Sequence, residues 1–360
     1  MMKKKKLTLI LDCFSMGGAE HMVYELLNNI DTAIFEVKVI CYARKCHTTL
    51  EQQAEQRFPI TYCNRTGRIT PVAICHIVRE IVKTKPDIVH AHLGGAGFGA
   101  VWTLLTRKPL VVTVHTKPEK AFSGKIESLI RLALAAGKTQ MVAVSHENSV
   151  LVQNYYGLDA SKSSFVNNGI TLERFYRAEH DIFTLINVAR QDDNKNQAAL
   201  IRCFARLHAA HPETRLLLLG DGANHERLKA LAAELGVSDA VTFTGNVSNT
   251  EDYYAVSDLY VQSSFREAMP LSVLEAMAAG LPIVATRVGG LCDVVRDNGF
   301  LVPPGDEDAL YAAIQDVYEM DAAQRTAMSQ ASLELVQGYS SVSMARAYEK
   351  IYQEMCEKHG

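Results

Sequence analysis

Short apolar or β-branched runs alternate with longer amphipathic segments along this chain, and the alternation limits the folds open to it. In the first half, runs with the composition of buried strands span residues 7–11, 35–42, 60–63, 87–92, 110–115 and 141–145. Helical periodicity occurs between them, over residues 19–29, 71–83 and 125–136. This order is typical of βαβ units, which build a parallel sheet with helices on both faces.

The alternation stops and then restarts in the middle of the chain. Asn167-Asn168-Gly169-Ile170 has the composition of a turn, and residues 173–181 are charged without strand periodicity, so we expect a linker there. Strand-like runs resume at residues 185–189, 215–219, 241–244, 259–262, 282–286 and 300–302. With 360 residues, the chain is long enough for two domains of ordinary size.

The sequence therefore predicts an α/β fold of two doubly wound, Rossmann-like domains facing each other across a cleft. We expect the first domain over residues 1–172 and the second over residues 173–338. Residues 339–360 are helical by pattern and are expected to return to the first domain. Because ligands of open parallel sheets bind beyond the carboxyl ends of the strands, residues at those ends are the candidates for a site.

Composition narrows the class of function. The formal net charge of -3 gives no reason to expect nucleic acid as a partner. The eight cysteines contain no Cys-x-x-Cys pair, which indicates neither a disulfide framework nor a zinc site and favours a reducing cytosol. The apolar run at residues 7–11 is too short for a signal peptide or a membrane span. The lysines before it, Lys3 to Lys6, either begin the first strand in solvent or contact anionic lipid headgroups.

Two carboxylates eight positions apart, Glu267 and Glu275, flank a predicted helix start. Residues 264–269 form a loop by composition, Pro270 suits the first helical position, and Gly280 suits the residue just past the end. Glu267 then precedes the helix and Glu275 lies on its second turn. Because a helix N-terminus exposes unpaired N–H groups, this segment is expected to hold an anion such as the diphosphate of a nucleotide sugar.

Strand ends in the first half supply further candidates. Gly17 and Gly18 open the first predicted helix, where the backbone can approach a ligand, although a simple tight turn explains them equally well. His115 ends a strand and can donate a hydrogen bond to a sugar hydroxyl or shuttle a proton, the alternative being a histidine packed at the strand end. His90 and His92 share one face of their strand, but without a third ligand they are interpreted as structural or as lining the acceptor side.

Strand ends in the second half point to a pyrophosphate. Arg190 and Lys195 lie in a strand-to-helix turn, where two cations suit a diphosphate leaving group, the alternative being a solvated loop. Gly220 ends the next strand and permits the close approach of a ligand or a neighbouring loop. Val247 follows the strand after that, where backbone groups can read a nucleobase edge.

Together these residues resemble the retaining glycosyltransferases of family four, which have the GT-B fold. The resemblance runs over nearly the whole chain and is most specific in the E-x7-E stretch from Glu267 to Glu275. The other motifs that carry it are Gly17-Gly18-Ala19-Glu20, His115, Val144-Ser145, Asn168-Gly169-Ile170 with Phe175, Val188-Ala189-Arg190 with Lys195, and Gly220-Asp221-Gly222.

The resemblance implies transfer of a sugar from a nucleotide-diphosphate donor, expected to be a UDP-sugar, with retention at the anomeric carbon and without an essential metal or other cofactor. It implies catalytic roles for His115, Glu267, Arg190 and Lys195. The nucleotide-sugar-binding residues that it implies are Gly17, Gly18, Arg190, Lys195, Gly220, Val247, Met269, Pro270, Leu271, Ser272 and Glu275. Within this set, Arg190 and Lys195 would hold the diphosphate and Glu275 the ribose hydroxyls.

The acceptor is expected to be a glycan or a lipid-linked glycan used in surface polysaccharide or glycolipid synthesis. Basic residues of the first half, namely Lys3 to Lys6, Arg65, Arg68, Lys117 and Lys120, fit a cytoplasmic enzyme held peripherally at an anionic membrane face. The alternatives are a nucleotide-sugar epimerase of the same architecture and a non-catalytic sugar-binding protein. A metal-dependent transferase would need an Asp-x-Asp pair at a strand end, and the pair present, Asp306 and Asp308, lies at a predicted helix start.

Overall fold

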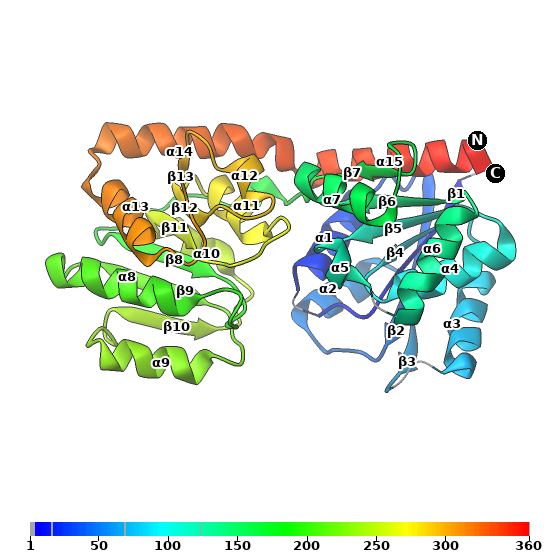
Figure 1. Ribbon diagram of the computed structural model, residues 1–360, viewed down its shortest axis with the longest axis horizontal. Helices are drawn as coiled ribbons and strands as arrows, with labels where there is room; N and C mark the ends of the chain where they lie inside the picture. Colours follow the sequence, from blue (N-terminus) through cyan, green and yellow to red (C-terminus); the bar gives the residue numbers. More distant parts are fainter. Residues whose placement is uncertain (1–3, 16, 68–69, 123, 360) are drawn as a thin grey trace. The chain divides into compact units, whose positions relative to one another are not determined.

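The structure is a computed structural model that describes residues 4–15, 17–67, 70–122 and 124–359 (Figure 1). The chain divides into two compact units, which are described separately: unit 1 comprises residues 1–169 with 341–360, and unit 2 comprises residues 170–340. The sequence predicts boundaries after residues 172 and 338, and the chain passes between the units after Gly169 and after Ser340. The C-terminal helix belongs to unit 1.

Among its described residues, unit 1 contains a parallel sheet with the strand order β3-β2-β1-β4-β5-β6-β7. Its strands are β1 (Lys5–Leu11), β2 (Phe35–Ala43), β3 (Ile60–Arg65), β4 (Ile88–His92), β5 (Leu110–Val114), β6 (Thr139–Ala143) and β7 (Ser163–Phe165). Its helices are α1 (Gly18–Asn29), α2 (Thr49–Arg57), α3 (Pro71–Lys83), α4 (Gly95–Thr106), α5 (Pro118–Ala121), α6 (Gly124–Ala135), α7 (His146–Tyr156) and α15 (Ser341–His359).

The central strands of unit 1 are buried on both faces, which explains their continuous apolar sequence. One hydrophobic cluster lies between the sheet and the helices α1 and α15, with Leu26 and Tyr352 among its buried members. A second cluster lies on the other face under α3, α4 and α6, and it contains Trp102 and Ile130. The doubly wound layering predicted from the sequence is therefore confirmed in this unit.

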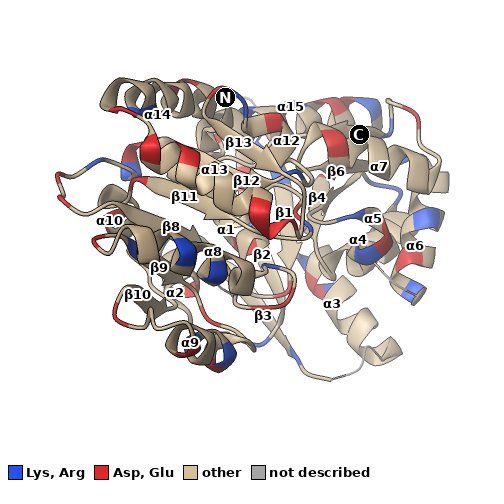
Figure 2. Cartoon of the chain, turned by 60° about the vertical axis from the view of Figure 1, so that its left-hand side comes forward, with Lys and Arg blue, Asp and Glu red and all other residues tan. Residues whose placement is uncertain are grey.

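Among its described residues, unit 2 contains a parallel sheet with the order β10-β9-β8-β11-β12-β13. Its strands are β8 (Thr184–Val188), β9 (Arg215–Leu219), β10 (Val241–Gly245), β11 (Leu259–Gln262), β12 (Ile283–Thr286) and β13 (Gly299–Val302). Its helices are η1 (Leu172–Arg174), α8 (Gln197–Ala210), α9 (His225–Glu234), α10 (Thr250–Ala255), α11 (Leu271–Ala278), α12 (Leu291–Val294), α13 (Glu307–Glu319), α14 (Ala322–Val336) and η2 (Gln337–Tyr339). Charged residues are frequent in α8, α9 and α13 and nearly absent from the strands of this unit (Figure 2).

Both sheets follow the same winding rule. The strand order reverses beside the first strand of each unit, between β1 and β4 and between β8 and β11. At such a switch point the loops that leave two neighbouring strands diverge to opposite faces of the sheet, which opens a crevice at the carboxyl ends. The switch points of the two sheets are therefore the places in the fold at which a ligand is expected.

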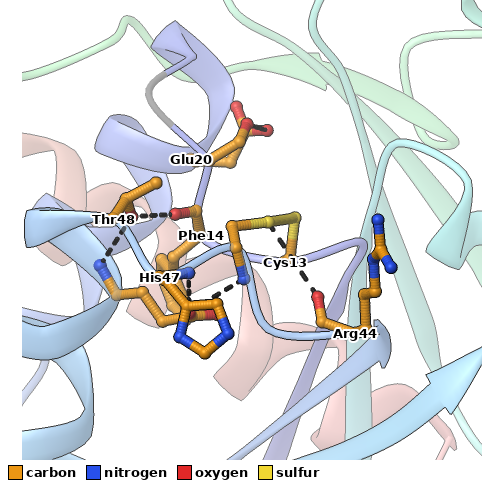
Figure 3. Close-up of a disulfide and its surroundings, with 9 residues drawn as sticks. Cys13, Phe14, Glu20, Arg44, His47 and Thr48 are labelled. Carbon is orange, nitrogen blue, oxygen red and sulfur yellow. Dashed lines mark hydrogen bonds between the residues drawn. A yellow bond between two sulfur atoms is a disulfide. The ribbon is translucent and has the colours of Figure 1, made fainter.

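Cys13 and Cys46 form a disulfide, so the prediction that the cysteines indicate no disulfide was wrong (Figure 3). Cys13 follows β1 and Cys46 follows β2, and these strands are paired in parallel with Leu11 opposite Cys41. Pairing brings the two loops together although 33 positions separate the cysteines. A spacing of this length has no local signature, and the sheet topology alone makes the two residues neighbours.

Helix α11 and strand β5 differ slightly from the predicted bounds. Pro270 is the N-cap of α11 and not its first helical residue, a shift of one position, and Gly280 follows the helix at a φ of +69°. His115 lies one residue beyond β5. Among the described residues, no helix is both long enough and apolar enough to cross a membrane.

Candidate active site

The centre of the site in unit 2 is an ion pair across the switch point. Lys195 follows β8 and Glu267 follows β11, and the Lys195 Nζ lies 2.6 Å from the Glu267 Oε1. The side chains of Lys195 and Glu267 are 19% and 9% exposed, so this pair is largely shielded from solvent. The same Glu267 oxygen accepts a hydrogen bond of 2.6 Å from the Gln262 side-chain amide. The carboxylate is therefore held by two donors at the carboxyl edge of the sheet.

The loop that carries Lys195 is fastened to the loop that carries Glu267. The Asn194 side chain donates to the Arg266 carbonyl at 2.9 Å, and the Phe265 N–H donates to the Asn194 carbonyl at 2.8 Å. The Ser263 hydroxyl donates to the Lys195 carbonyl at 2.9 Å. These bonds fix the two loops against each other. The position of the ion pair is therefore set by the backbone of both loops and not only by the flexible Lys195 side chain.

A pair of glycines supports the backbone of Glu267, and the sequence reasoning missed it. Gly289 has a φ of +53°, and a Cβ added there would overlap the Glu267 carbonyl oxygen. The Gly290 N–H donates to the Ala268 carbonyl at 2.6 Å. Only glycine fits this contact without strain. The sequence does contain a Gly-Gly pair shortly after the β12 strand. Like the other glycines considered, this pair follows the carboxyl end of a strand.

Helix α11 carries Glu275 on its second turn, as predicted. The Tyr254 hydroxyl donates to the Glu275 Oε2 at 3.0 Å and is also 3.0 Å from the Ser272 carbonyl oxygen. The Tyr260 hydroxyl lies 2.8 Å from the Ser272 Oγ. Burial, with the nearby Glu275 as a further cause, raises the pKa of Tyr254 well above its ordinary value. Both tyrosines are fully buried neutral donors, and the sequence reasoning missed them.

The remaining residues predicted in unit 2 surround this centre. Arg190 is exposed and its guanidinium contacts the Asp192 carboxylate at 2.7 Å, while the Asp192 Oδ1 accepts the Lys195 N–H at 3.2 Å. Gly220 has a φ of +112°, and an added Cβ would overlap the Ala189 carbonyl, so this glycine accommodates a neighbouring loop. Val247 is half-buried beyond β10. Met269 is buried beside the start of α11.

Unit 1 places its predicted residues at strand ends as well. Gly17 is the N-cap of α1 and Gly18 its first residue. A Cβ added at Gly17 would overlap the Glu20 carboxylate, which the Ser15 hydroxyl also contacts at 2.5 Å. A Cβ at Gly18 would meet no atom of the described residues within 4 Å, so the chain itself does not demand glycine there. The open backbone at Gly18 is suited to the close approach of a ligand.

His115 belongs to a cluster of three histidines. Its Nε2 lies 3.0 Å from the Nδ1 of His92, and the rings of His92 and His90 are tilted by 45° with centroids 4.0 Å apart. Burial lowers the pKa of His115 to about 4 and lowers the pKa of His90 and His92 well below the ordinary value. All three imidazoles are therefore neutral near pH 7. The sequence placed His90 and His92 on one face, but it did not show that His92 contacts His115.

The structure also places the residues that bear on metals and membranes. Among the described residues, no group of three or more His, Cys, Asp or Glu side chains is arranged to hold a metal ion. Asp306 caps helix α13 by accepting the Ala309 N–H at 2.9 Å, and Asp308 pairs with Arg206. The basic residues are divided: Lys5 and Lys6 begin β1 and are half-buried, Arg65 is half-buried, Lys4, Lys117 and Lys120 are exposed, and Lys3 and Arg68 lie outside the described residues.

Two Rossmann-like units with this strand order, and with charged and glycine-rich loops at the carboxyl ends, have the architecture of a GT-B glycosyltransferase. HepE from Anabaena in complex with UDP has the same fold, with a TM-score of 0.81 and 21% identity over 97% of this chain and 100% of that one. Sucrose-phosphate synthase from Thermosynechococcus elongatus also has a TM-score of 0.81, at 20% identity over 99% of this chain and 100% of its own.

Family models and relatives define the family. The model for glycosyl transferases group 1 matches residues 171–334, and the model for Glycosyltransferase Family 4 matches residues 16–174. D-inositol 3-phosphate glycosyltransferase 2 from Catenulispora acidiphila is 30% identical over 292 residues, which cover 68% of each chain. EpsD from Bacillus subtilis is 39% identical over 140 residues, 38% of this chain and 37% of EpsD. The chain belongs to glycosyltransferase family 4.

Proposed function

We propose that the protein transfers a sugar from a UDP-sugar to an acceptor hydroxyl with retention at the anomeric carbon. The observation that carries the proposal is the Lys195–Glu267 pair, which joins a cation and a carboxylate at the switch point of unit 2. A cation there suits the diphosphate, and a carboxylate beside it suits the sugar attached to that diphosphate. HepE, which shares the fold, has been solved with UDP, with UDP and glucose, and with UDP-glucose.

The proposal gives the residues of unit 2 separate tasks. Lys195 and Arg190 neutralise the diphosphate and stabilise the charge that grows on it as the glycosidic bond breaks. The backbone from Met269 to Ser272 lies at the same phosphates, and the N–H groups at the start of α11, from Leu271 and Ser272, point toward them, because the N-cap Pro270 offers no side-chain acceptor. Glu275 accepts hydrogen bonds from the ribose hydroxyls.

Other residues are proposed to contact the donor sugar, and the leaving diphosphate is proposed to activate the acceptor. In unit 2 Glu267 is assigned to the donor sugar, and in unit 1 His115 and the open backbone at Gly18 are assigned to sugar hydroxyls. The leaving diphosphate helps to remove the proton of the acceptor hydroxyl. The acceptor attacks the anomeric carbon on the same face from which the diphosphate departs, so the anomeric configuration is kept. Because Lys195 and Arg190 supply the positive charge at the diphosphate, the proposed reaction needs no metal ion or other cofactor.

A glycan or a lipid-linked glycan is the proposed acceptor, used in surface polysaccharide or glycolipid synthesis. The names of relatives support an acceptor with hydroxyls close to a negative charge: they include enzymes acting on inositol 3-phosphate, malate and phosphatidylinositol. The exposed Lys4, Lys117 and Lys120 support a peripheral contact with an anionic membrane on its cytoplasmic face. Co-sedimentation with anionic and neutral vesicles tests this contact, and equal binding to both would contradict it.

The test of the function has two stages. A thermal-shift screen with UDP, GDP and ADP and their sugars identifies the nucleotide, because a ligand that binds only the folded protein raises its unfolding temperature. Mass spectrometry then follows sugar transfer to glycan and lipid-linked acceptors in the presence of a chelator, and nuclear magnetic resonance assigns the anomeric configuration. Conversion of the donor sugar without an acceptor would indicate an epimerase, and binding without turnover would indicate a sugar-binding protein. Loss of activity in the chelator would contradict the metal-free reaction.

A further inference from the structure

The His92–His115 contact raises the question of which ring carries the shared proton. His92 is the last residue of β4 and is 0% exposed, whereas His115 follows β5 and is partly exposed. Their facing atoms, the Nδ1 of His92 and the Nε2 of His115, are 3.0 Å apart. At this distance one nitrogen donates and the other accepts. In a neutral imidazole one nitrogen is the donor and the other the acceptor, so the choice fixes the tautomer of both rings.

The second nitrogen of His92 decides between the two arrangements. The His92 Nε2 is buried and has no hydrogen-bond partner among the described residues. If His115 donated, the proton of His92 would sit on this Nε2 as a buried N–H without an acceptor. If His92 donates, the Nε2 keeps only a lone pair. Buried N–H groups without a partner are rarer in proteins than under-satisfied acceptors, so the second arrangement is favoured.

A third arrangement, in which one ring is an imidazolium, would allow both nitrogens of that ring to donate. It would place a charge inside a cluster that contains His90 and two fully buried tyrosines, Tyr348 and Tyr352. Desolvation opposes this charge. The pKa of each of the three histidines is lowered by burial, in agreement with a neutral cluster.

We infer that His92 is a positioning residue: its Nδ1–H donates to the His115 Nε2 and holds His115 as the tautomer with its proton on Nδ1. His115 then presents an N–H donor, and not a lone pair, to a ligand at the carboxyl edge of the sheet. A donor at this position recognises an oxygen with a free lone pair, such as a hydroxyl of the donor sugar. This assignment rests on the proposed function only in naming a sugar as the ligand, because the tautomer is a property of the free protein.

Nuclear magnetic resonance of the full-length protein with ¹⁵N-labelled histidine measures the tautomer directly. Couplings between ring nitrogens and ring protons distinguish Nδ1–H from Nε2–H, and the His115→Asn variant identifies the His115 signals by their loss. The expected result is an Nδ1–H tautomer for His115 at pH 7.5. An Nε2–H tautomer for His115, or an imidazolium, would overturn the inference.

Substitutions at His92 separate donation from packing. His92→Leu has no donor and is expected to release His115 to a mixture of tautomers, whereas the side-chain amide of His92→Asn donates from nearly the place of Nδ1 and is expected to preserve the Nδ1–H signal. His90→Leu is the matched control, because His90 is also 0% exposed on the same face of β4 but bonds to Tyr352 at 2.6 Å and to Thr113 at 2.7 Å. We expect this control to lose stability and to keep the His115 tautomer. The same shift in the control as in His92→Leu would show a packing effect and overturn the inference.

Kinetics connects the tautomer to the ligand. With the donor and acceptor found in the functional screen, kcat/KM is expected to fall about tenfold in His92→Leu, the size of one lost hydrogen bond, and to recover in large part in His92→Asn. Equal kcat/KM values for the two variants would overturn the positioning role. If the wild-type protein transfers no sugar at all, the proposed function fails, while the nuclear magnetic resonance result still decides the tautomer.

Discussion

Lys195 and Glu267 are 72 residues apart in the sequence and 2.6 Å apart in space, and each leaves one of the two strands that flank the switch point of unit 2. The Glu267 carboxylate is paired with the Lys195 ammonium group that the proposed diphosphate needs. Binding of the donor therefore has to compete with an internal partner. This relationship predicts that the two members of the pair have opposite effects on nucleotide affinity.

Lys195→Ala is expected to weaken UDP binding, and Glu267→Gln is expected to strengthen it several-fold, because a neutral amide leaves the ammonium free for phosphate. Both variants are expected to lose turnover by on the order of 10²–10³-fold, since each removes a charge at the reacting centre. Calorimetric titration with UDP and initial rates of transfer provide the two readouts. Arg206→Ala, which breaks the exposed pair with Asp308, is the control and should leave both unchanged. Full sugar transfer by Lys195→Ala would contradict the assignment.

Glu275 is predicted to act on the nucleotide and not on the sugar. Glu275→Gln should raise the KM for the donor and the Kd for UDP by about tenfold, with little change in the kcat at saturation, because it alters binding that is equal in the ground and transition states. Tyr254→Phe removes the hydroxyl that donates to Glu275 at 3.0 Å and should produce a smaller effect in the same direction. A fall in kcat with an unchanged KM in Glu275→Gln would place Glu275 at the chemistry instead.

The Cys13–Cys46 disulfide is predicted to stabilise unit 1. Closing a loop over a separation of 33 residues is worth about 3–4 kcal/mol in the chain-entropy model. Cys13→Ser, or reduction of the wild-type protein, should therefore lower the unfolding temperature by on the order of 5–10 °C. Cys75→Ser, at an exposed free cysteine, is the matched control and should not change it. Mass spectrometry of peptides from the unreduced protein checks the linkage, and free thiols at both positions would refute it.

The histidine cluster predicts a loss of stability in mild acid. The folded-state pKa of His115 is lowered to about 4 and those of His90 and His92 are also lowered, so the unfolded chain binds protons as the pH falls through about 6.5 while the folded chain does not. The stability contributed by keeping His115 neutral is present above pH 6.5 and is lost between about pH 6.5 and 4, by up to about 1.4 kcal/mol per pH unit, and the contributions of His90 and His92 are likewise lost as the pH falls below 6.5. Denaturant unfolding at pH 7.5, 6.5 and 5.5 measures this slope. His90→Asn removes one titrating group and should show a shallower slope, and an identical slope would contradict the prediction.

The sheets could be predicted from the sequence because buried parallel strands are continuous apolar runs. β9 and β11 begin and end at the predicted residues, Arg215–Leu219 and Leu259–Gln262. Strand β7 (Ser163–Phe165) was missed, since it is three residues long and begins with two serines. Glu267 and Glu275 could be found because their spacing encodes a local loop-to-helix geometry.

The contacts that hold the site could not be predicted in the same way. Tyr254 and Glu275 are 21 residues apart on different helices, and His92 meets His115 only because β4 and β5 pair in parallel. The local sequence does not indicate such contacts, because the packing of the helices and the register of neighbouring strands determine which side chains meet. The Cys13–Cys46 linkage has the same origin in the pairing of β1 with β2.

Gly289 is predicted to be required for activity through the backbone of Glu267. Its φ of +53° disfavours other residues, and an added Cβ would also overlap the Glu267 carbonyl, so Gly289→Ala has to displace the loop that carries Glu267, the carboxylate proposed to contact the donor sugar. A displacement of about 1 Å at such a group lowers kcat/KM by on the order of 10²-fold. Gly236→Ala is the matched control: Gly236 has a φ of +70°, but a Cβ there would enter open space. The control should lose about 1 kcal/mol of stability and keep full activity. If both variants lose stability equally and both keep their kcat/KM, the glycine pair does not position Glu267.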